Sequence, residues 1–409
     1  MYLTFAWRYF KAKKSANAIN IIAWVTAGVI AFATCCQVLV LSVFNGFEGL
    51  VKSLYASFYT DMKVIPAKGK TITLTPEQLA QIRQLPFIQA VCLEAEEKAL
   101  MQNNEADGAQ TVVFLKGVDE NYGRVSGVPG KTSKGRFNTG TMDEPGIVMG
   151  AGIEYAAAVN LNPATATQSL TIILPKKNSA GSDPIQSLSE GNVVPEGVFF
   201  IQQDFDNKYA ITNLDFVKRQ TGMAADEYSA AELKLKDKTD INLAREKLAN
   251  LLGNNYRVQT LYEQNMSLYN TMRMEKWVIY AVLTLILIVS AFTMISALTM
   301  LVLEKQKDIS VLQSMGAHTS AVQKIFLTEG LLLGAIGTVC GISLSVILCL
   351  LQMKFKVVKI GGGSFLIDYF PVKLVITDFL LVAATAGIIA FIAAWFPARK
   401  ASRQPFELK

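Results

Sequence analysis

Hydrophobic residues are concentrated in four long runs, and more polar segments separate these runs. Each run is longer than the ~20 residues that a helix needs to cross the ~30 Å hydrocarbon core of a bilayer. The runs lie at about Ala18–Phe44, Trp277–Leu303, Ile325–Leu351 and Leu374–Phe396. The pattern therefore predicts four transmembrane helices, with a large region of ordinary globular composition between the first two.

This intervening region alternates strand and helix signals, which predicts an α+β domain with two subdomains. Runs rich in β-branched and aromatic residues are expected as strands: Met62–Ile65, Ile88–Met101, Thr111–Val118, Gly146–Met149, Ser169–Leu174 and Val198–Gln202. Capping residues and apolar periodicity predict helices at Thr75–Leu85, Ala151–Leu161, Ala210–Thr221 and Thr239–Leu252. Gly130–Glu144 and Lys176–Pro195 lack periodicity. We expect them to be loops.

A short charged segment, Glu304–His318, separates the second hydrophobic run from the third. Ile309, Leu312 and Met315 recur at spacing three, and Gly316 is a natural place for a helix to end. Charged residues cluster at the start of the segment: Glu304, Lys305, Lys307 and Asp308. We expect a small amphipathic helix against the bilayer face, suited to transmitting movement between two membrane helices. The alternative is a solvated connector.

Charge is divided unevenly between the two parts of the chain. The segment Gly46–Glu275 contains 23 Lys/Arg and 27 Asp/Glu, whereas the remainder contains 16 and 6. The basic excess therefore belongs to the membrane part and does not argue for nucleic-acid binding. Residues 1–17 combine aromatic residues with cations, so we expect an amphipathic elbow in the bilayer surface rather than a signal peptide.

Positive charge also predicts the orientation in the membrane. Four Lys/Arg precede the first run, which places both chain ends and Glu304–His318 in the cytoplasm and the large domain outside. The short outer loop Met353–Lys373 opposes this bias because it carries four lysines: Lys354, Lys356, Lys359 and Lys373. We keep the orientation because the first helix usually sets it.

The sequence predicts no catalytic or metal site. His318 is the only histidine, which excludes histidine-pair metal sites. The triplets Gly69–Thr71 and Gly130–Thr132 lack the first glycine of a phosphate loop. Cys92 is the single cysteine of the large domain, so no disulfide can form within it. We therefore expect a non-catalytic chain without a cofactor, whose energy source is a partner.

Small residues line one face of each of the last two predicted membrane helices. They follow a 4-3-4 spacing: Gly330, Gly334, Gly337 and Gly341, then Ala383, Gly387, Ala390 and Ala394. Such faces let helix backbones approach closely in lipid. We expect them to hold the third and fourth helices together as one rigid unit.

Four segments resemble motifs of the lipoprotein-releasing permeases LolC and LolE. Leu41–Glu48 is similar to their SVMNGFE signature, and Lys307–Ala317 to their K-x-D-I-x-x-L-x-x-M-G-A coupling helix. Phe365–Val372 resembles their outer-loop motif, and Phe396–Pro405 their tail motif. Two further matches are Asp215-Phe216-Val217 and Asn265. The coupling and tail motifs alone would indicate the wider group that includes MacB and FtsX. The amino-terminal motif Leu41–Glu48 and the outer-loop motif Phe365–Val372 narrow the resemblance to the Lol branch.

The resemblance implies a membrane protein of four transmembrane helices, with a large MacB-like periplasmic domain inserted between helices 1 and 2. The expected boundaries are 1–17 for the elbow, 18–44 for helix 1, 45–275 for the periplasmic domain, 276–303 for helix 2, 304–320 for the coupling helix, 321–352 for helix 3, 353–373 for the outer loop, 374–397 for helix 4 and 398–409 for the cytoplasmic tail.

The resemblance also implies a function and partners. The chain would work as a homo- or heterodimer with a LolD-like ATPase dimer that binds ATP and Mg. It would extract lipoproteins from the outer leaflet of the bacterial inner membrane and pass them to a LolA-like periplasmic carrier. A LolC-like, a LolE-like and a combined homodimeric role stay open. The alternatives are an FtsX-like regulator of cell-wall hydrolases and a MacB-like export component.

Two sites follow from the resemblance. Acyl chains are expected near a set of residues just above helices 1 and 2, for which the alternative is plain interfacial packing: Phe47, Leu50, Leu54, Met266, Tyr269 and Met272. Carrier binding is expected at Lys176–Pro195, which corresponds to the hook loop of LolC but differs from it in composition and length. The expected contacts there are Pro175, Pro184, Ile185 and Leu188. The alternative for this stretch is disorder.

Overall fold

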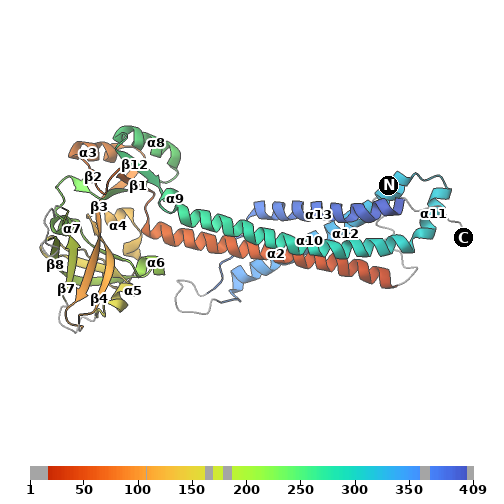
Figure 1. Ribbon diagram of the computed structural model, residues 1–409, viewed down its shortest axis with the longest axis horizontal. Coiled ribbons are helices and arrows are strands. Elements are labelled where there is room, and N and C mark those ends of the chain that lie inside the picture. Colours follow the sequence, from red (N-terminus) through yellow and green to blue (C-terminus); the bar gives the residue numbers. More distant parts are fainter. Residues whose placement is uncertain (1–16, 107, 162–168, 178–186, 360–368, 403–409) are drawn as a thin grey trace. The chain divides into compact units, whose positions relative to one another are not determined.

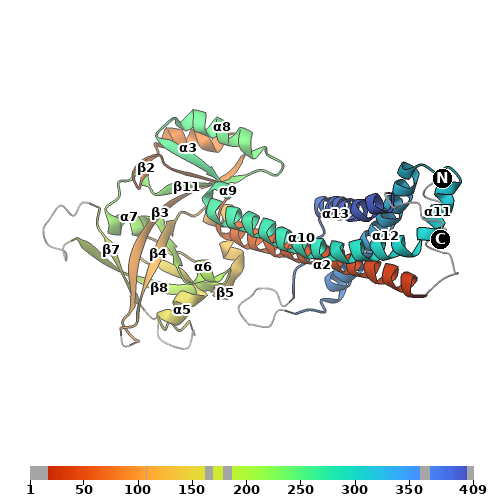
Figure 2. The same ribbon diagram turned by 45° about the vertical axis from the view of Figure 1, so that its right-hand side comes forward.

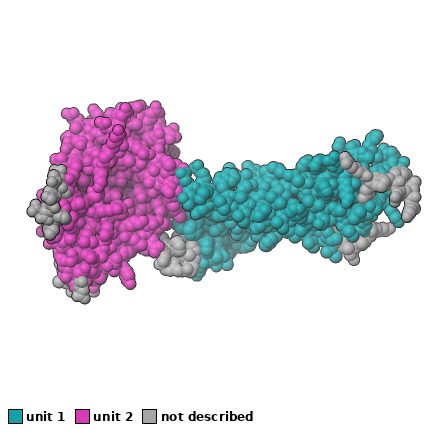
Figure 3. Space-filling view, viewed as in Figure 1, with its two compact units in different colours: residues 1–50, 270–361, 367–409 teal, residues 51–269, 362–366 magenta. Residues whose placement is uncertain are grey.

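A computed structural model describes residues 17–106, 108–161, 169–177, 187–359 and 369–402. The chain divides into two compact units, shown in different colours in Figure 3. The helical unit comprises residues 1–50, 270–361 and 367–409, and the sheet unit comprises residues 51–269 and 362–366. Residues 1–16 of the expected amino-terminal elbow, the end of the tail motif and the first half of the outer-loop motif lie outside the described residues.

Long apolar helices build the helical unit, in which α2, α10, α12 and α13 run alongside one another (Figure 1). Their bounds, with the short helix α11, are α2 Asn17–Phe58, α10 Met266–Glu304, α11 Gln306–Ser314, α12 Thr319–Phe355 and α13 Ile376–Ser402. Among the described residues, four helices are long and apolar enough to cross a membrane, as predicted. At ~1.5 Å per residue, α2 and α10 are each about twice as long as the hydrocarbon core is thick. Both continue into the sheet unit.

Glycines on one face of α12 bring it against two neighbouring helices. A Cβ atom added at Gly330 would lie 2.4 Å from the Cβ of Ala394 on α13. One added at Gly334 would lie 2.6 Å from the Cβ of Ala390, also on α13. At Gly341 the same atom would lie 2.4 Å from the backbone oxygen of Ala31 on α2. The expected close approach of the third and fourth helices is therefore present, and the other half of the glycine face packs against the first helix instead.

A ten-stranded mixed sheet organises the sheet unit, with strand order β12-β1-β11-β3-β4-β9-β6-β8-β5 and β7 paired with β3 and β8. Its strands are β1 Met62–Pro66, β3 Ile88–Asn103, β4 Gln110–Val118, β5 Thr132–Gly135, β6 Gly146–Gly150, β7 Leu170–Pro175, β8 Leu188–Phe199, β9 Tyr209–Asn213, β11 Ala230–Leu235 and β12 Tyr256–Thr260. β2 Ile72–Thr73 pairs with β10 Glu227–Tyr228 in a separate ladder.

Short helices cover this sheet. They are α3 Pro76–Gln84, α4 Tyr122–Val125, the 3₁₀ helix η1 Val128–Lys131, α5 Ala151–Ala156, α6 Gln203–Asp206, α7 Leu214–Thr221, α8 Ile241–Leu252 and α9 Leu261–Gln264. Helices α3 and α8 lie side by side in both ribbon views (Figures 1 and 2). The fold class predicted from the sequence, four membrane helices with an α+β domain between the first and second, is confirmed.

Each face of the sheet has its own hydrophobic core, because side chains alternate along the strands. Val91 and Leu93 of β3 point into the larger core, whereas Cys92 between them points into the smaller one. The smaller core also contains Tyr55 and Phe58, from the end of α2 that belongs to the sheet unit. The helix thus ends inside the core of this unit. The expected division into two subdomains stays a prediction.

Most predicted strands and helices are present, but several assignments were wrong in part. Ala210–Asn213 forms strand β9 rather than the first turn of a helix, because its residues pair with β4 and β6. Helix α7 starts afterwards, where the Asn213 side chain accepts hydrogen bonds from Asp215 N at 2.9 Å and Phe216 N at 3.2 Å. Helix α5 ends at Ala156, before the predicted Leu161. Strand β8 ends at Phe199, before the predicted Gln202.

Both segments expected as loops contain strands. Thr132–Gly135, within Gly130–Glu144, forms β5. Leu188–Phe199 forms β8, which begins inside the predicted loop Lys176–Pro195 and pairs with β7 over Leu188–Val193. The first part of β8 is a run of polar and glycine residues, Ser189–Asn192, without the apolar alternation of a half-buried strand. The polarity of this segment therefore hid the strand pattern.

Candidate functional site

The predicted coupling segment forms helix α11 between α10 and α12. The Nζ atom of Lys305 lies 3.2 Å from a carboxylate oxygen of Asp308 in the first turn. The helix ends at Ser314, and Gly316 follows with a φ of 92°. This left-handed conformation favours glycine, so Gly316 allows the chain to turn into α12. Glu304 ends α10, and Lys307 is exposed on α11.

The apolar stripe of α11 is divided between two surroundings. Ile309 is buried and packs against its own chain, in a cluster with Leu301, Val302, Val322, Phe326, Ala398 and Ala401. Leu312 is half-buried, whereas Met315 is 80% exposed and Val311 is 59% exposed. Residues 311 and 315 share one face of a helix. The surface available to a partner therefore consists of Val311 and Met315 with Leu312 at its edge, and Ile309 is not part of it.

A polar cluster that the sequence reasoning missed joins three helices of the helical unit. The Nζ atom of Lys276 on α10 lies 3.1 Å from both carboxylate oxygens of Asp378 on α13. It also donates to the Oδ1 atom of Asn45 on α2 at 2.9 Å, and the Nδ2 atom of Asn45 donates to Asp378 at 2.6 Å. Asn45 and Asp378 are buried. Asp378 lies within a predicted apolar run, and a charge in such a run was the signal available in the sequence.

Two segments that resemble Lol motifs, Leu41–Glu48 and the described part of Phe365–Val372, are in contact beside this cluster. A Cβ atom added at Gly46 would lie 2.2 Å from the backbone oxygen of Pro371, in the loop between α12 and α13. The backbone N–H of Lys373 donates to the backbone oxygen of Ser42 at 2.9 Å. The loop therefore lies directly on the α2 backbone, and glycine at position 46 makes this approach possible.

The six residues expected to contact acyl chains belong to both units. Phe47, Leu50 and Met272 lie in the helical unit, and Met272 is buried. Leu54, Met266 and Tyr269 lie in the sheet unit, where Met266 is 43% exposed. Their role stays a prediction.

The expected carrier-binding stretch is a hairpin connection. Pro175, the last residue of β7, pairs with Leu188, the first residue of β8. The N–H of Lys176 donates to the backbone oxygen of Ser187 at 2.8 Å and closes the base of the connection. Leu188 is 46% exposed. Pro184 and Ile185 lie outside the described residues, so the carrier contact stays a prediction.

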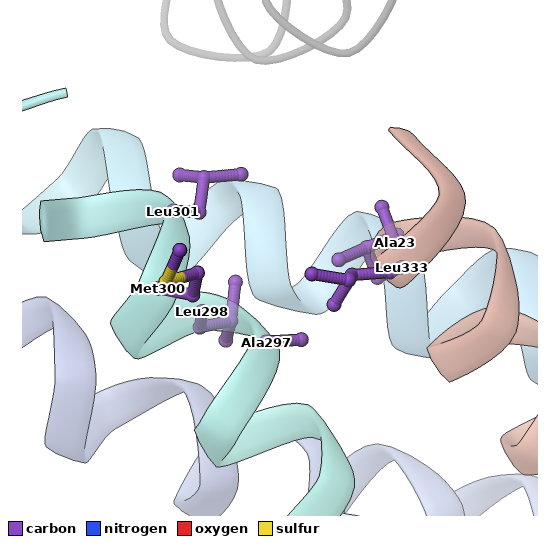
Figure 4. A pocket seen from close by; sticks show the side chains of 7 residues that line it. Ala23, Ala297, Leu298, Met300, Leu301 and Leu333 are labelled. Carbon is purple, nitrogen blue, oxygen red and sulfur yellow. The ribbon is translucent and has the colours of Figure 1, made fainter. Parts of the chain in front are cut away.

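The small cavity shown in Figure 4 does not provide a ligand site. It lies between α2, α10 and α12 and is lined by Ala23, Ala297, Leu298, Met300, Leu301 and Leu333, with Ile22. Its volume is about 10 Å³. That is close to the space of one water molecule, and its walls are apolar. It is a packing gap between the helices.

Charged side chains in the sheet unit form a buried network. The Nζ atom of Lys116 on β4 lies 2.9 Å from Glu94 of β3 and 2.7 Å from Glu232 of β11, and Lys63 of β1 pairs with Glu94 at 2.5 Å. Burial alone would raise the pKa of Glu94, but the charges of Lys116 and Lys63 overcome this effect and hold the pKa at about 2. Burial raises the pKa of Glu232 to about 7. The network ties four strands together.

Metal chemistry has no support in the described part of the chain. There, no group of three or more His, Cys, Asp and Glu side chains could hold a metal ion.

Comparison with known sequences shows similarity over almost the whole chain. The lipoprotein-releasing system transmembrane protein LolC of Neisseria meningitidis serogroup B is 27% identical, over 98% of this chain and 96% of its own length. LolC of Xylella fastidiosa strain 9a5c is 25% identical over the same shares, and LolE of Haemophilus influenzae is 25% identical over 98% and 97%. The family described as FtsX-like permease C-terminal matches residues 280–406.

Two solved structures are similar to part of the chain. The periplasmic region of MacB from Actinobacillus actinomycetemcomitans is 14% identical with a TM-score of 0.37, over 52% of this chain and 95% of that chain. The extracellular domain of the transporter YknZ from Gram-positive bacteria is 13% identical with a TM-score of 0.33, over 49% and 99%.

The sequence comparisons confirm the resemblance to the LolC and LolE permeases. Together with the match of α10–α13 to the FtsX-like C-terminal family, they support a permease subunit of an ABC transporter. Such a subunit implies an ABC ATPase and a second permease subunit as partners.

Proposed function

We propose that this chain is a permease subunit that extracts lipoproteins from the outer leaflet of the bacterial inner membrane and passes them to a periplasmic carrier. The observation that carries the proposal is the similarity to LolC and LolE over nearly the full length of both proteins. The large domain lies in the periplasm, and the four helices span the inner membrane. The chain holds no ATP, Mg or other cofactor; a separate LolD-like ATPase dimer hydrolyses ATP.

The connections between elements support transmission of movement from such an ATPase. Helix α11 presents Val311 and Met315 outward, while Ile309 fixes it to α10, α12 and α13. A displacement of α11 therefore moves these helices with it. Helix α10 continues without interruption from Met266 to Glu304. One element thus joins the coupling helix to the sheet unit.

Substrate and carrier complete the proposal. Lipoprotein acyl chains lie near Phe47, Leu50 and Met272 of the helical unit. The carrier, a LolA-like protein, contacts the connection between β7 and β8. The chain works as a homodimer or with a second, related permease subunit.

Release from proteoliposomes tests this function. The chain is reconstituted with its ATPase and a triacylated lipoprotein, and soluble carrier is added with ATP. We expect lipoprotein to appear on the carrier in the soluble fraction. An ATPase variant that cannot hydrolyse ATP and a lipoprotein without acyl chains are the matched controls. Equal release in either control would contradict the proposal. Activation of a cell-wall hydrolase without lipoprotein release would favour an FtsX-like regulator instead.

A further inference from the structure

The loop between α12 and α13 borders a cavity that the proposed function does not use. The cavity has a volume of about 520 Å³ and lies within the helical unit. Its walls come from α2, α12 and this loop, and include Val40, Val43, Leu348, Leu351, Val358 and Phe370. This size lies within the range of about 300–1,000 Å³ that is typical of ligand pockets.

Hydrogen bonds fix the loop wall of the cavity. The Nε2 atom of Gln352 donates to the backbone oxygens of Val358 at 2.9 Å and Phe370 at 3.2 Å. Its Oε1 atom accepts from the N–H of Val358 at 2.9 Å. Gln352 is the one amide or charged side chain among the lining residues, and these contacts use both ends of its amide. The space itself therefore offers apolar surface, in a shape set before any ligand binds.

The lining also leaves apolar surface uncovered. Val357 is 70% exposed and Val358 is 54% exposed, although both lie beside the cavity. Within a bilayer, the apolar ligand present in large excess is the acyl chain of a lipid. A chain seated in the cavity would cover this surface.

Lysines flank the lining residues of the loop in the sequence. Val357, Val358 and Val372 line the cavity. Lys356 precedes Val357, Lys359 follows Val358 and Lys373 follows Val372. Together with Lys354, all are exposed. The described residues of the loop, 353–359 and 369–373, include no carboxylate. These are the four lysines that oppose the positive-inside pattern. Exposed lysines next to the residues of an apolar cavity are complementary to a lipid with an anionic headgroup.

We propose that this cavity binds one acyl chain of an anionic phospholipid from the surrounding bilayer, and that the loop lysines contact its phosphate. This lipid is a bound component of the permease rather than its cargo. The lysines are thus retained outside the membrane because they bind a headgroup. The proposal does not depend on lipoprotein release, since it concerns a different surface and a different lipid.

Photolabelling in nanodiscs tests the acyl-chain contact. The full chain is placed in nanodiscs that contain phosphatidylglycerol with a diazirine on one acyl chain, and labelled peptides are identified by mass spectrometry. We expect labels on residues 39–43 and 348–358, and about five-fold less label in Leu348→Trp, which fills the cavity. Val339→Trp is the matched control, because Val339 lies on the same helix, is 63% exposed and does not line the cavity.

The lysines are tested separately by competition. Unlabelled phosphatidylglycerol should reduce labelling of the wild-type cavity about five-fold more effectively than phosphatidylcholine. Lys354→Gln/Lys356→Asn/Lys373→Gln should abolish this preference, and Lys324→Gln should retain it. These surface changes leave the packed walls intact, so they test the proposal even if Leu348→Trp unfolds the protein. Equal competition by the two lipids in the wild type would overturn it. So would cavity labelling that Leu348→Trp leaves unchanged, or a crosslink through the cavity to a second copy of the chain.

Discussion

At the scale of single residues, charges in both units are retained where fixed partners surround them. Asp378 would be costly in an apolar helix bundle, but Lys276 and Asn45 satisfy its carboxylate at distances of 2.6 to 3.1 Å. The sequence places Lys276 and Asp378 on two different predicted helices, and Asn45 directly after a third. Nothing in their spacing says that they meet, because only the packing of α2, α10 and α13 brings them together.

Removal of one partner from this cluster should cost more stability than removal of both. Breaking a buried ion pair costs ~3–5 kcal/mol, and exposure of part of Lys276 reduces this to roughly 1–3 kcal/mol for Lys276→Met or Asp378→Leu alone. Lys276→Met/Asp378→Leu removes both charges and should recover most of the loss. Thermal unfolding in detergent measures each variant in a double-mutant cycle. Equal losses in the single and double variants would show that the ion pair contributes nothing.

Glu94 should make the stability of the chain depend on pH in acid. Its pKa is lowered from 4.5 to about 2 in the fold by Lys116 and Lys63, which outweigh the opposing effect of burial. Its stabilising contribution is therefore complete above pH 4.5 and is lost as the pH falls from 4.5 toward 2. Glu232 is protonated in the folded chain across this window, because its pKa in the fold is about 7.

Unfolding at several pH values checks this dependence. The wild type should lose roughly 1–3 kcal/mol from Glu94 between pH 4.5 and pH 2. Glu94→Gln should be less stable at neutral pH and should show a smaller decline in acid. Glu97→Gln, on the same strand, is the control. An identical acid decline in Glu94→Gln and the wild type would contradict the assignment.

At the scale of elements, the periodicity of apolar residues predicted helices and strands, but it did not predict which neighbouring element each face packs against. A spacing of three among Ile309, Leu312 and Met315 indicated the helix α11. It could not show that Ile309 is buried against α10, α12 and α13 while Met315 is exposed. The same limit applies to β9: the segment 210–213 followed by a capped helix fits a helical pattern until its pairing with β4 and β6 is known.

The two faces of α11 should give different mutant phenotypes. Met315→Asp and Leu312→Asp place a charge on the outward surface and should uncouple ATP hydrolysis from transport with little change in unfolding temperature. Ile309→Ala removes a buried side chain and should cost roughly 2–4 kcal/mol of stability. ATPase activity, lipoprotein release and thermal unfolding are measured for each variant. Full coupling in Met315→Asp would show that the ATPase does not bind this face.

Two glycines of α2 provide a matched pair. Gly46→Ala would bring Cβ to 2.2 Å from the backbone oxygen of Pro371. A side chain could rotate away from this contact, but a backbone atom moves only if the loop itself is displaced. We expect a loss of roughly 1–3 kcal/mol as the loop is displaced. Gly28 has no atom within 4 Å of an added Cβ, so Gly28→Ala should be neutral or stabilise the helix by up to about 1 kcal/mol. Equal unfolding temperatures for the two variants would contradict the close approach.

At the scale of the whole molecule, the sequence predicted the division into membrane helices and one inserted α+β domain. Long apolar runs identify membrane helices because the bilayer sets their minimum length. The same rule cannot say where a helix ends once it leaves the bilayer. Thus α2 continues to Phe58 and α10 begins at Met266, well beyond the apolar runs. These extensions carry movement between the bundle and the outer domain in the proposed mechanism.

Replacement of residues 178–186 with a Gly-Ser turn should separate carrier binding from the rest of the transport cycle. The change spares β7 and β8, whose pairing begins at Pro175 and Leu188, so the sheet should remain folded. Membrane insertion and basal ATPase activity should be unchanged, whereas release of lipoprotein to the carrier should fall to background. Replacement of the exposed segment Lys236–Lys238, which follows β11, is the control. Undiminished release from the shortened chain would show that the carrier contacts another surface or the second permease subunit.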